Sequence, residues 1–355
     1  MSRFLVSKYQ AMQEYTPGEQ PTDRSYIKLN TNESPYPPSE SVLKAVNSDE
    51  ASLLRLYPDP TCKRLKAKMA SLYGLKPENI FISNSSDDML NLAFMAFASD
   101  EKKAYFADIT YGFYEVFSAL HSVKTEIIPL KDDFTIDVSD YMNLEPGLIV
   151  IANPNAPTGL AISTDEIKKI CQSNPESVVI IDEAYVNFGA ESALPLIWES
   201  DNLIVTRTFS KAMSMAGARL GYAMACPELI NDLEKMKYST NPYSVNRITL
   251  AAGEAAADDI NYYRINCRRI IQTRQNTMKK LAELGFEFTD SKANFIFCRT
   301  DKMPGEKIFD ELKSRGILVR RFNKDKISDY LRISIGTDDD MKALISALED
   351  ILKEA

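Results

Sequence analysis

Residues 178–225 read VVIIDEAYVNFGAESALPLIWESDNLIVTRTFSKAMSMAGARLGYAMA and decide the fold. The stretch holds three short apolar runs, at Val178–Asp182, Leu203–Thr208 and Gly221–Ala225. Each run is too short for a helix and is apolar at successive positions, which is typical of a strand buried on both faces. The first run ends at Asp182, and Lys211 follows the second, so both polar groups are expected at strand ends.

The same pattern continues on both sides of this stretch. Further strands are predicted at Ile80–Ser83, Lys103–Phe106, Lys124–Ile128 and Leu148–Ala152. Between them the apolar spacing predicts helices at Thr61–Tyr73, Asp87–Ala98, Tyr111–Leu120, Thr164–Gln172 and Pro227–Lys237. Strands that alternate with helices favour a mostly parallel sheet covered on both faces, so we expect an α/β domain with a seven-stranded sheet.

The pattern changes after Pro242. A long helical stretch at 245–284 precedes strands near 286–289, 294–299, 318–321 and 330–334, with helices at 305–315 and 338–353. This order predicts a second, smaller α+β domain. The expected division is an N-terminal arm or small-domain segment at 1–40, a large domain at 41–245 and a small domain at 246–355.

Composition excludes several classes of protein. The chain has 355 residues and a net charge of −8, which disfavours binding to a nucleic-acid backbone. Its apolar runs are too short to span a bilayer, and its first residues lack the apolar core of a secretion signal, so a cytoplasmic location is expected. Five scattered cysteines and the single His121 give no metal-ligand cluster, and His-based hydrolysis is disfavoured. No metal, nucleic-acid or membrane partner is expected.

Asp182, Tyr185 and Lys211 together suggest pyridoxal 5′-phosphate (PLP) chemistry. This cofactor needs an amine for a Schiff base, an anion beside its ring nitrogen, donors for its phenolate oxygen and a phosphate cradle. Lys211 offers the amine and a proton shuttle, Asp182 the anion and Tyr185 a donor. Each residue could also have an ordinary structural role: Asp182 could cap a turn, Tyr185 could pack in a core, and Lys211 could lie in solvent.

Candidates for the phosphate cradle come from two segments. Ser86 and Asp87 open a predicted helix, whose backbone N–H groups and dipole favour an anion. Near Lys211, hydroxyl and guanidinium groups suited to phosphate are those of Thr208, Ser210 and Arg219. Tyr111 opens the next helix and is a candidate for stacking on the cofactor ring, although a core aromatic would look the same.

These motifs, in this order, resemble the fold-type-I PLP-dependent aminotransferases, within their class-II subfamily. The resemblance runs nearly end to end: LNTNESPYPPS at 29–39, SNSSDDML at 83–90, ITYGFY at 109–114, DEAY at 182–185 and SKAMSMAGARLGY at 210–222. It implies the same roles for Lys211, Asp182 and Tyr185, and it implies that Tyr111 stacks on the ring. Ser85 stands where that family usually has glycine.

Two further motifs carry implications from the same family. LYPDP at 56–60 implies that Tyr57 reaches the cofactor phosphate of a neighbouring subunit, and hence a homodimer with shared active sites. NPNAPTG at 153–159 resembles the family's PNNPTG, whose asparagine before PTG donates to the phenolate oxygen. Here that position is Ala156, so either Asn155 reaches the oxygen or Tyr185 makes the contact alone.

The resemblance is strongest to the histidinol-phosphate branch of the family. It implies transamination between L-histidinol phosphate and 2-oxoglutarate, which forms glutamate, in histidine biosynthesis. LRISIG at 331–336 implies that Arg332 binds substrate anions. Three further residues are implied to assist it: Tyr15, Asn294 and Arg320.

Other functions fit the same residues. An aromatic amino acid aminotransferase would use the same cofactor site and present Arg332 to a carboxylate. A threonine-phosphate decarboxylase is a lyase of similar build. A catalytically silent regulator of this fold would not need Lys211 and would normally carry a basic DNA-binding segment, which is not seen in this sequence.

Overall fold

The computed structural model describes residues 2–10 and 12–353. Its centre is a seven-stranded sheet with the strand order β2-β8-β7-β6-β5-β3-β4. Strand β8 runs antiparallel to both of its neighbours, β2 and β7, and all the other pairings in this sheet are parallel. The prediction of a mostly parallel α/β sheet is therefore confirmed. The strands are β2 (Ile80–Ser83), β3 (Lys103–Ala107), β4 (Thr125–Ile128), β5 (Gly147–Ala152), β6 (Val178–Asp182), β7 (Leu203–Thr208) and β8 (Gly221–Met224).

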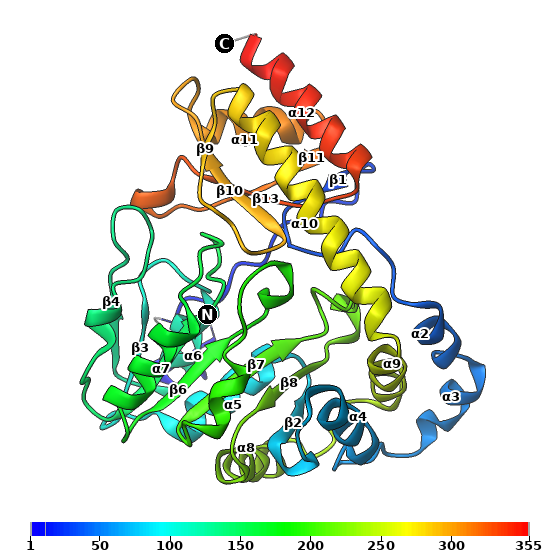
Figure 1. Cartoon of the computed structure of the whole chain (residues 1–355), viewed down its shortest axis with the longest axis vertical. Helices are drawn as coiled ribbons and strands as arrows, with labels where there is room; N and C mark the ends of the chain where they lie inside the picture. Colours follow the sequence, from blue (N-terminus) through cyan, green and yellow to red (C-terminus); the bar gives the residue numbers. More distant parts are fainter. Residues whose placement is uncertain (1, 11, 354–355) are drawn as a thin grey trace.

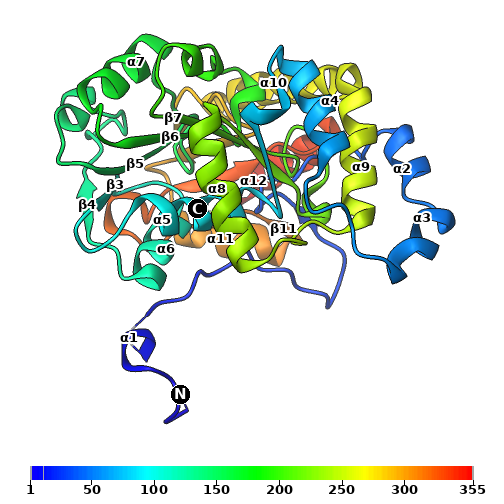
Figure 2. The same cartoon turned by 90° about the horizontal axis from the view of Figure 1, so that it is seen from below.

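Helices cover both faces of this sheet, because successive residues of its strands point to opposite sides. Along β6, Val179 and Ile181 belong to one apolar cluster and Ile180 to another. One face is covered by α4 (Lys63–Tyr73), α7 (Thr164–Ser173) and α9 (Arg247–Asp258). The other is covered by α5 (Ser86–Phe97), α6 (Phe113–His121) and α8 (Pro227–Thr240), as Figure 2 shows from below.

A second domain lies above the first in Figure 1 and has its own core. Its antiparallel sheet has the order β12-β13-β10-β9, with β9 (Glu287–Phe288), β10 (Phe295–Arg299), β12 (Arg320–Arg321) and β13 (Leu331–Ser334). Three helices pack on it: α10 (Ile260–Glu283), α11 (Gly305–Ser314) and α12 (Asp338–Lys353). The chain's N-terminal part joins this domain, since β1 (Ile27–Lys28) pairs in parallel with β11 (Ile317–Leu318).

The packing places the change of domain later than the predicted boundary at residue 245. Leu250 and Ala256 of α9, and Tyr263 at the start of α10, belong to the large-domain cluster. The predicted helical stretch 245–284 is two helices, because Asp259 lies outside the regular helix between them. Helix α10 then runs from the large domain to the small one (Figure 1).

The remaining elements are short. The N-terminal α1 (Ser7–Gln10) extends away from the body in Figure 2. Helices α2 (Glu40–Ala45) and α3 (Ser48–Ser52) lie beside α9. The 3₁₀ turns are η1 (Leu53–Arg55), η2 (Pro77–Asn79), η3 (Val138–Tyr141), η4 (Val186–Phe188), η5 (Leu194–Trp198), η6 (Ala216–Ala218) and η7 (Asp325–Ile327). Within the described ranges, no helix is long and apolar enough to cross a membrane.

A buried ion pair ties the end of β7 to the residue after β6. The guanidinium of Arg207 lies 2.8 Å from a carboxylate oxygen of Glu183, and both side chains are almost fully buried. Glu183 also accepts hydrogen bonds from the backbone N–H of Ala193 and the hydroxyl of Ser192. The ion pair and these hydrogen bonds hold the two strand ends next to each other.

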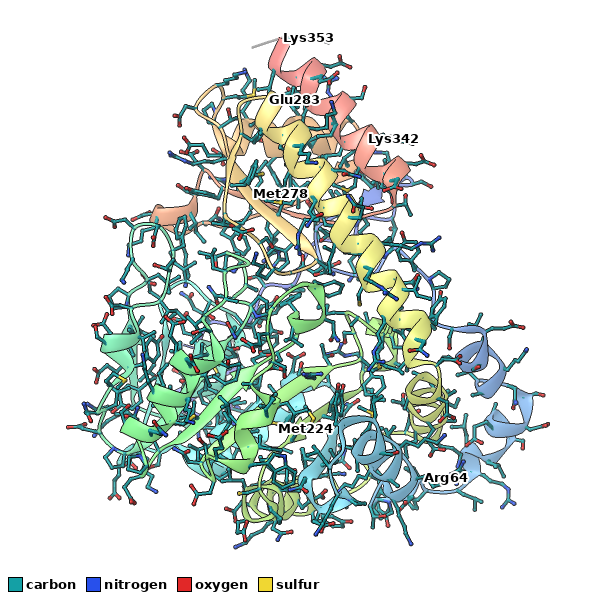
Figure 3. The ribbon with its side chains drawn as sticks, viewed as in Figure 1. Arg64, Met224, Met278, Glu283, Lys342 and Lys353 are labelled. Atoms are coloured by element: carbon teal, nitrogen blue, oxygen red, sulfur yellow. The ribbon has the colours of Figure 1, made fainter. Side chains whose placement is uncertain are left out.

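Glu183→Gln should lower the free energy of unfolding by about 3–5 kcal/mol, because it leaves the Arg207 charge buried without a countercharge. The measurement is the urea midpoint followed by circular dichroism. Asp339→Asn is the control: Asp339 is exposed and pairs with Lys342, which points away from the body on α12 (Figure 3), so the midpoint of this variant should not move. Equal midpoints for the two variants would contradict a structural role for the buried pair.

Candidate active site

One large cavity lies at the carboxyl edge of the seven-stranded sheet, between the sheet, the small domain and the N-terminal arm. Its volume is about 1030 Å³. Open α/β sheets bind ligands at this edge, where strand ends and the following loops meet. The residues expected from the sequence that line it are Tyr15, Ser86, Asp87, Tyr111, Asp182, Tyr185, Thr208, Ser210, Lys211, Arg219, Arg320 and Arg332.

Asp182 is the last residue of β6 and is buried, with 5% of its surface exposed. One carboxylate oxygen accepts a hydrogen bond from the hydroxyl of Tyr114 at 2.8 Å, and the other from the backbone N–H of Ala184 at 3.1 Å. Burial raises the pKa of Asp182 to about 6, and these two hydrogen bonds oppose that rise. A positive ring nitrogen beside the carboxylate would favour its ionised form.

Lys211 follows β7 and faces the same cavity. Its ammonium nitrogen donates to the backbone oxygen of Thr31 at 3.1 Å and lies 5.8 Å from the centre of the Tyr185 ring. Thr31 belongs to the N-terminal segment, so this contact reaches across from the large domain to the part of the chain that joins the small domain. Within the described residues this carbonyl is the one hydrogen-bond acceptor of the amine, which leaves the amine able to turn toward a ligand.

Tyr185 is held by an asparagine that the sequence analysis did not identify. Its hydroxyl oxygen accepts a hydrogen bond from the side-chain amide of Asn32 at 3.0 Å. Asn32 is fixed in turn by Ser334, whose hydroxyl accepts from its backbone N–H and donates to its side-chain oxygen. Because the oxygen of Tyr185 accepts this bond, its hydroxyl hydrogen is available to donate to a ligand.

The anion cradle forms where α5 begins. Ser85 caps this helix, and Ser86 and Asp87 in its first turn line the cavity. Asp87 accepts from the hydroxyl of Tyr111 at 2.8 Å and pairs with the guanidinium of Arg219 at 2.9 Å. Asp87 therefore fixes both of these side chains, while the N–H groups of the helix start and the arginine present donors to an anion.

Ser85 and Gly221 explain the backbone of this cradle. Ser85 has φ of +88°, a conformation that favours glycine, so the serine keeps the shape that the usual glycine would have. Gly221 on β8 lies directly against the helix start: a β-carbon there would sit 2.3 Å from the backbone nitrogen of Ser86. Only glycine permits this close approach.

Two arginines face the cavity from the small domain. Arg332 donates to the backbone oxygen of Asn30 at 3.1 Å and lies between the rings of Phe295 and Phe322. Its ε-nitrogen is buried without a hydrogen-bond partner among the described residues, and burial lowers the pKa of the side chain. Such an unsatisfied cationic donor indicates an anionic ligand. Arg320 donates to the backbone oxygens of residues 16 and 17.

Tyr15 enters the cavity from the N-terminal arm. Its ring stacks on Phe113 with 4.2 Å between centroids. Burial raises the pKa of its hydroxyl above the usual value, so the group stays a neutral donor.

Three expected site residues do not line this cavity. Tyr57 is on the surface, 79% exposed, and stacks on Tyr243. The amide of Asn155 turns inward, where it donates to the backbone oxygen of Ile109 and to Thr158 and accepts from Thr110. Asn155 therefore holds its loop together, and Ala156 faces the cavity instead.

The third of these residues, Asn294, is buried behind the cavity. It donates to the backbone oxygen of Asn32 at 2.9 Å, so it supports the asparagine that holds Tyr185.

Sequence reasoning missed Tyr114 and Asn32. Both lie in motifs that were recognised, ITYGFY and LNTNESPYPPS. Their positions within those motifs could have indicated a role. The sequence does not show their hydrogen-bond partners, because Asp182 is 68 positions from Tyr114 and Tyr185 is 153 positions from Asn32.

The residues present fit the PLP expected from the sequence. One cavity brings together a lysine, a buried carboxylate, a tyrosine hydroxyl and an anion cradle, which are the four groups that this cofactor needs. The unsatisfied Arg332 lies on the opposite wall, where a substrate anion would meet it. The arrangement can hold a phosphorylated ring on the sheet side and a second anionic molecule on the side of the small domain.

Comparison with known proteins agrees with this chemistry. The model of the aminotransferase class I and II family matches residues 24–348. A histidinol-phosphate aminotransferase of Brachyspira hyodysenteriae is 49% identical over 354 residues, covering 99% of this chain and 100% of that protein. One of Marinomonas sp. is 47% identical over 353 residues, with 99% and 100% covered.

Solved structures give the same result. Histidinol-phosphate aminotransferase from Sinorhizobium meliloti, in complex with pyridoxal-5′-phosphate, has a TM-score of 0.83 at 27% identity, covering 93% of this chain and 92% of that one. A putative histidinol-phosphate aminotransferase from Erwinia carotovora atroseptica has a TM-score of 0.84 at 26% identity, covering 93% and 96%. The chain therefore belongs to the class I and II aminotransferase family.

Proposed function

We propose that the protein is a PLP-dependent aminotransferase that exchanges an amino group between L-histidinol phosphate and 2-oxoglutarate. Glutamate and imidazole-acetol phosphate are the products in one direction. The observation that carries the proposal is the full-length identity to histidinol-phosphate aminotransferases, in a chain whose cavity joins Lys211, Asp182 and Arg332. The step belongs to histidine biosynthesis, and the free cysteines fit a reducing cytoplasm.

PLP, when bound, withdraws electrons from the substrate carbon that bears the amine and carries the amino group between the two substrates. Asp182 would keep the ring nitrogen protonated, and Tyr185 would donate to the phenolate oxygen. The α5 N–H groups, Ser210 and Arg219 would hold the phosphate. Thr208 supports this cradle, because its hydroxyl accepts from the backbone N–H of Ser210 at 3.0 Å.

Lys211 has two tasks in this scheme. It would attach the cofactor through its amine, and it would move a proton to and from the substrate carbon. The carbonyl of Thr31 accepts from this amine and holds it at the cavity wall. Tyr111 would lie against the ring, since the bond of its hydroxyl to Asp87 fixes the plane of its side chain.

Arg332 would bind the anionic end of each substrate in turn. Histidinol phosphate offers a phosphate, and glutamate and 2-oxoglutarate offer a carboxylate. A guanidinium donates to both groups in a bidentate way. Arg320 and Tyr15 lie on the same side of the cavity and would assist with the phosphate.

The proposed assembly is a homodimer in which Tyr57 completes the cradle of the partner. Tyr57 cannot serve its own cavity, because it lies on the surface. It stacks on the exposed Tyr243, and two further exposed apolar residues, Leu54 and Leu56, are close to it in the sequence, which is typical of an interface.

The test of the reaction is the visible spectrum of the purified protein with PLP, recorded after L-histidinol phosphate and then after 2-oxoglutarate. The band of bound PLP should be lost with the first and return with the second. A band that responds to phenylalanine and not to histidinol phosphate would favour an aromatic aminotransferase. Release of carbon dioxide from threonine phosphate would favour the decarboxylase.

Lys211→Ala should lower turnover by about a thousandfold or more, the scale of a positioned acid–base group. Borohydride should fix PLP to the peptide that contains Lys211 in the parent protein and to no peptide in the variant, as read by mass spectrometry. Lys292→Ala is the control, since Lys292 is on the surface in an ion pair with Asp290. Full activity in Lys211→Ala would refute the proposed function.

Arg332→Ala should raise KM for both histidinol phosphate and glutamate by about tenfold or more, because each loses a charge-assisted hydrogen bond. Steady-state kinetics with each substrate varied in turn measures the effect. Arg321→Ala is the matched control, because Arg321 lies in the same small-domain sheet and pairs with Glu306 outside the cavity. A rise in only one KM would show that separate groups bind the two anions.

Tyr57→Phe should weaken PLP binding by about tenfold through loss of one hydrogen bond to a charged group. Sedimentation should show a dimer for both the parent and the variant. Tyr243→Phe removes the hydroxyl of the ring stacked on Tyr57 and should leave PLP affinity unchanged. A monomer with full PLP affinity would rule out the shared site.

A further inference from the structure

Tyr114 is a fully buried tyrosine beneath the cavity. It is the second residue of α6, and its surface exposure is 0%. Its ring meets those of Phe106 and Tyr111 edge to face, at 5.8 and 5.6 Å between centroids. Tyr114 does not line the cavity, whereas Asp182 does. The hydroxyl of Tyr114 contacts the site through its 2.8 Å bond to Asp182, and the ring packs on Tyr111, which lines the cavity.

In the contact between the buried hydroxyl of Tyr114 and the buried carboxylate of Asp182, the hydroxyl must be the donor. Burial, followed by the charge of Asp182, raises the pKa of Tyr114 well above its usual value, so its hydroxyl always carries a proton. The hydroxyl donates, and the carboxylate accepts. This donation favours the ionised form of Asp182 in surroundings whose low polarity favours the neutral form.

The other charged groups near Asp182 do not stabilise its ionised form. Asp87 on α5 and Glu183 after β6 both repel its negative charge. Their own charges are balanced elsewhere, since Asp87 pairs with Arg219 and Glu183 with Arg207. Other titratable side chains that line the cavity include Tyr15, Glu33, Tyr111, Tyr185, Lys211 and Arg332. Lys211 donates to Thr31 and Tyr111 donates to Asp87, so Tyr114 is the side chain that donates to Asp182.

The hydrogen bond also fixes the direction of the carboxylate. Tyr114 holds one oxygen and the backbone N–H of Ala184 holds the other, so the plane of the group cannot turn. The carboxylate keeps further lone pairs that can accept, and Asp182 lines the cavity. A ring nitrogen that approaches from the cavity meets an acceptor already oriented for it, which saves the cost of ordering it on binding.

We propose that Tyr114 is a positioning residue for the reaction: it keeps Asp182 ionised and aimed at the ring nitrogen of PLP. The proposal rests on the role given to Asp182 in the proposed function. It adds a residue that touches neither cofactor nor substrate. It also explains why a tyrosine, and not a phenylalanine, occupies this position in an apolar cluster.

The test compares Tyr114→Phe, Asp182→Asn, the double variant and Tyr105→Phe. Tyr105 is an equally buried tyrosine on β3 whose hydroxyl makes no hydrogen bond among the described residues, so Tyr105→Phe removes the same atom without touching Asp182. The measurement is the dissociation constant of PLP by ultrafiltration from pH 5.5 to 9, without substrate. The PLP phosphate titrates in this range whichever protein is present. The dissociation constant of each variant is therefore divided by that of the parent at the same pH, and this ratio is compared.

Loss of the Tyr114 bond raises the pKa of Asp182 above its value of about 6 and leaves the carboxyl partly protonated near neutral pH. The ratio for Tyr114→Phe should therefore be about tenfold near pH 6.5 and fall to about twofold at pH 9, where Asp182 is ionised in both proteins. Tyr105→Phe should give a ratio of one throughout. The double variant should bind no more weakly than Asp182→Asn, because both changes act through the same carboxylate.

A pH-independent ratio for Tyr114→Phe, or additive losses in the double variant, would show that Tyr114 only packs, while the role of Asp182 stands. A ratio of one for Asp182→Asn at every pH would overturn both the role of Asp182 and this inference. Melting of the PLP-free proteins provides the check on folding. Tyr114→Phe should melt below Tyr105→Phe because it loses a bond to a charged group, but both should stay folded at the assay temperature, so a pH-dependent loss of PLP binding is not a loss of fold.

Discussion

The parallel pairing of β6 with β7 is the constraint on which the site depends. It places Asp182 opposite Thr206, so the carboxylate and the turn that carries Lys211 leave the sheet at one edge. The ion pair of Glu183 with Arg207 fixes the same two strand ends from the opposite face. With this edge fixed, the loops after β3 and β5, the start of α5 and the small domain have only to close around it.

Much of this arrangement could be predicted from the sequence, because it depends on local patterns. The apolar runs of the large domain gave its seven strands, and the polar residues that end them gave Asp182 and Lys211. The order of motifs indicated the aminotransferase family, which the comparisons confirm. Less local features were missed: the break at Asp259 between two helices, and the packing of α9 on the large domain beyond the predicted boundary.

The hydrogen-bond partners of the site could not be predicted, because they join residues far apart in the chain. Nothing near Tyr114 indicates that its hydroxyl meets Asp182, and nothing near Asn32 indicates Tyr185. Asn155 shows the opposite case: the motif suggested a cofactor contact, whereas its amide is used by Thr110, Ile109 and Thr158. A short polar side chain takes the nearest buried partner, and the sequence does not show which partner is nearest.

The N-terminal arm bears on how the protein is made. Strand β1 pairs with β11, and Asn32 bonds to Ser334 across a separation of 302 positions. A ribosome that adds about 5–20 residues per second needs roughly 15–60 s to pass from one to the other. During that interval the large sheet can form while β1 and Asn32 still lack their partners in the small domain. The cavity that contains Lys211 is therefore completed only when synthesis is almost finished. Until then, a nascent chain lacks the complete site that binds the cofactor.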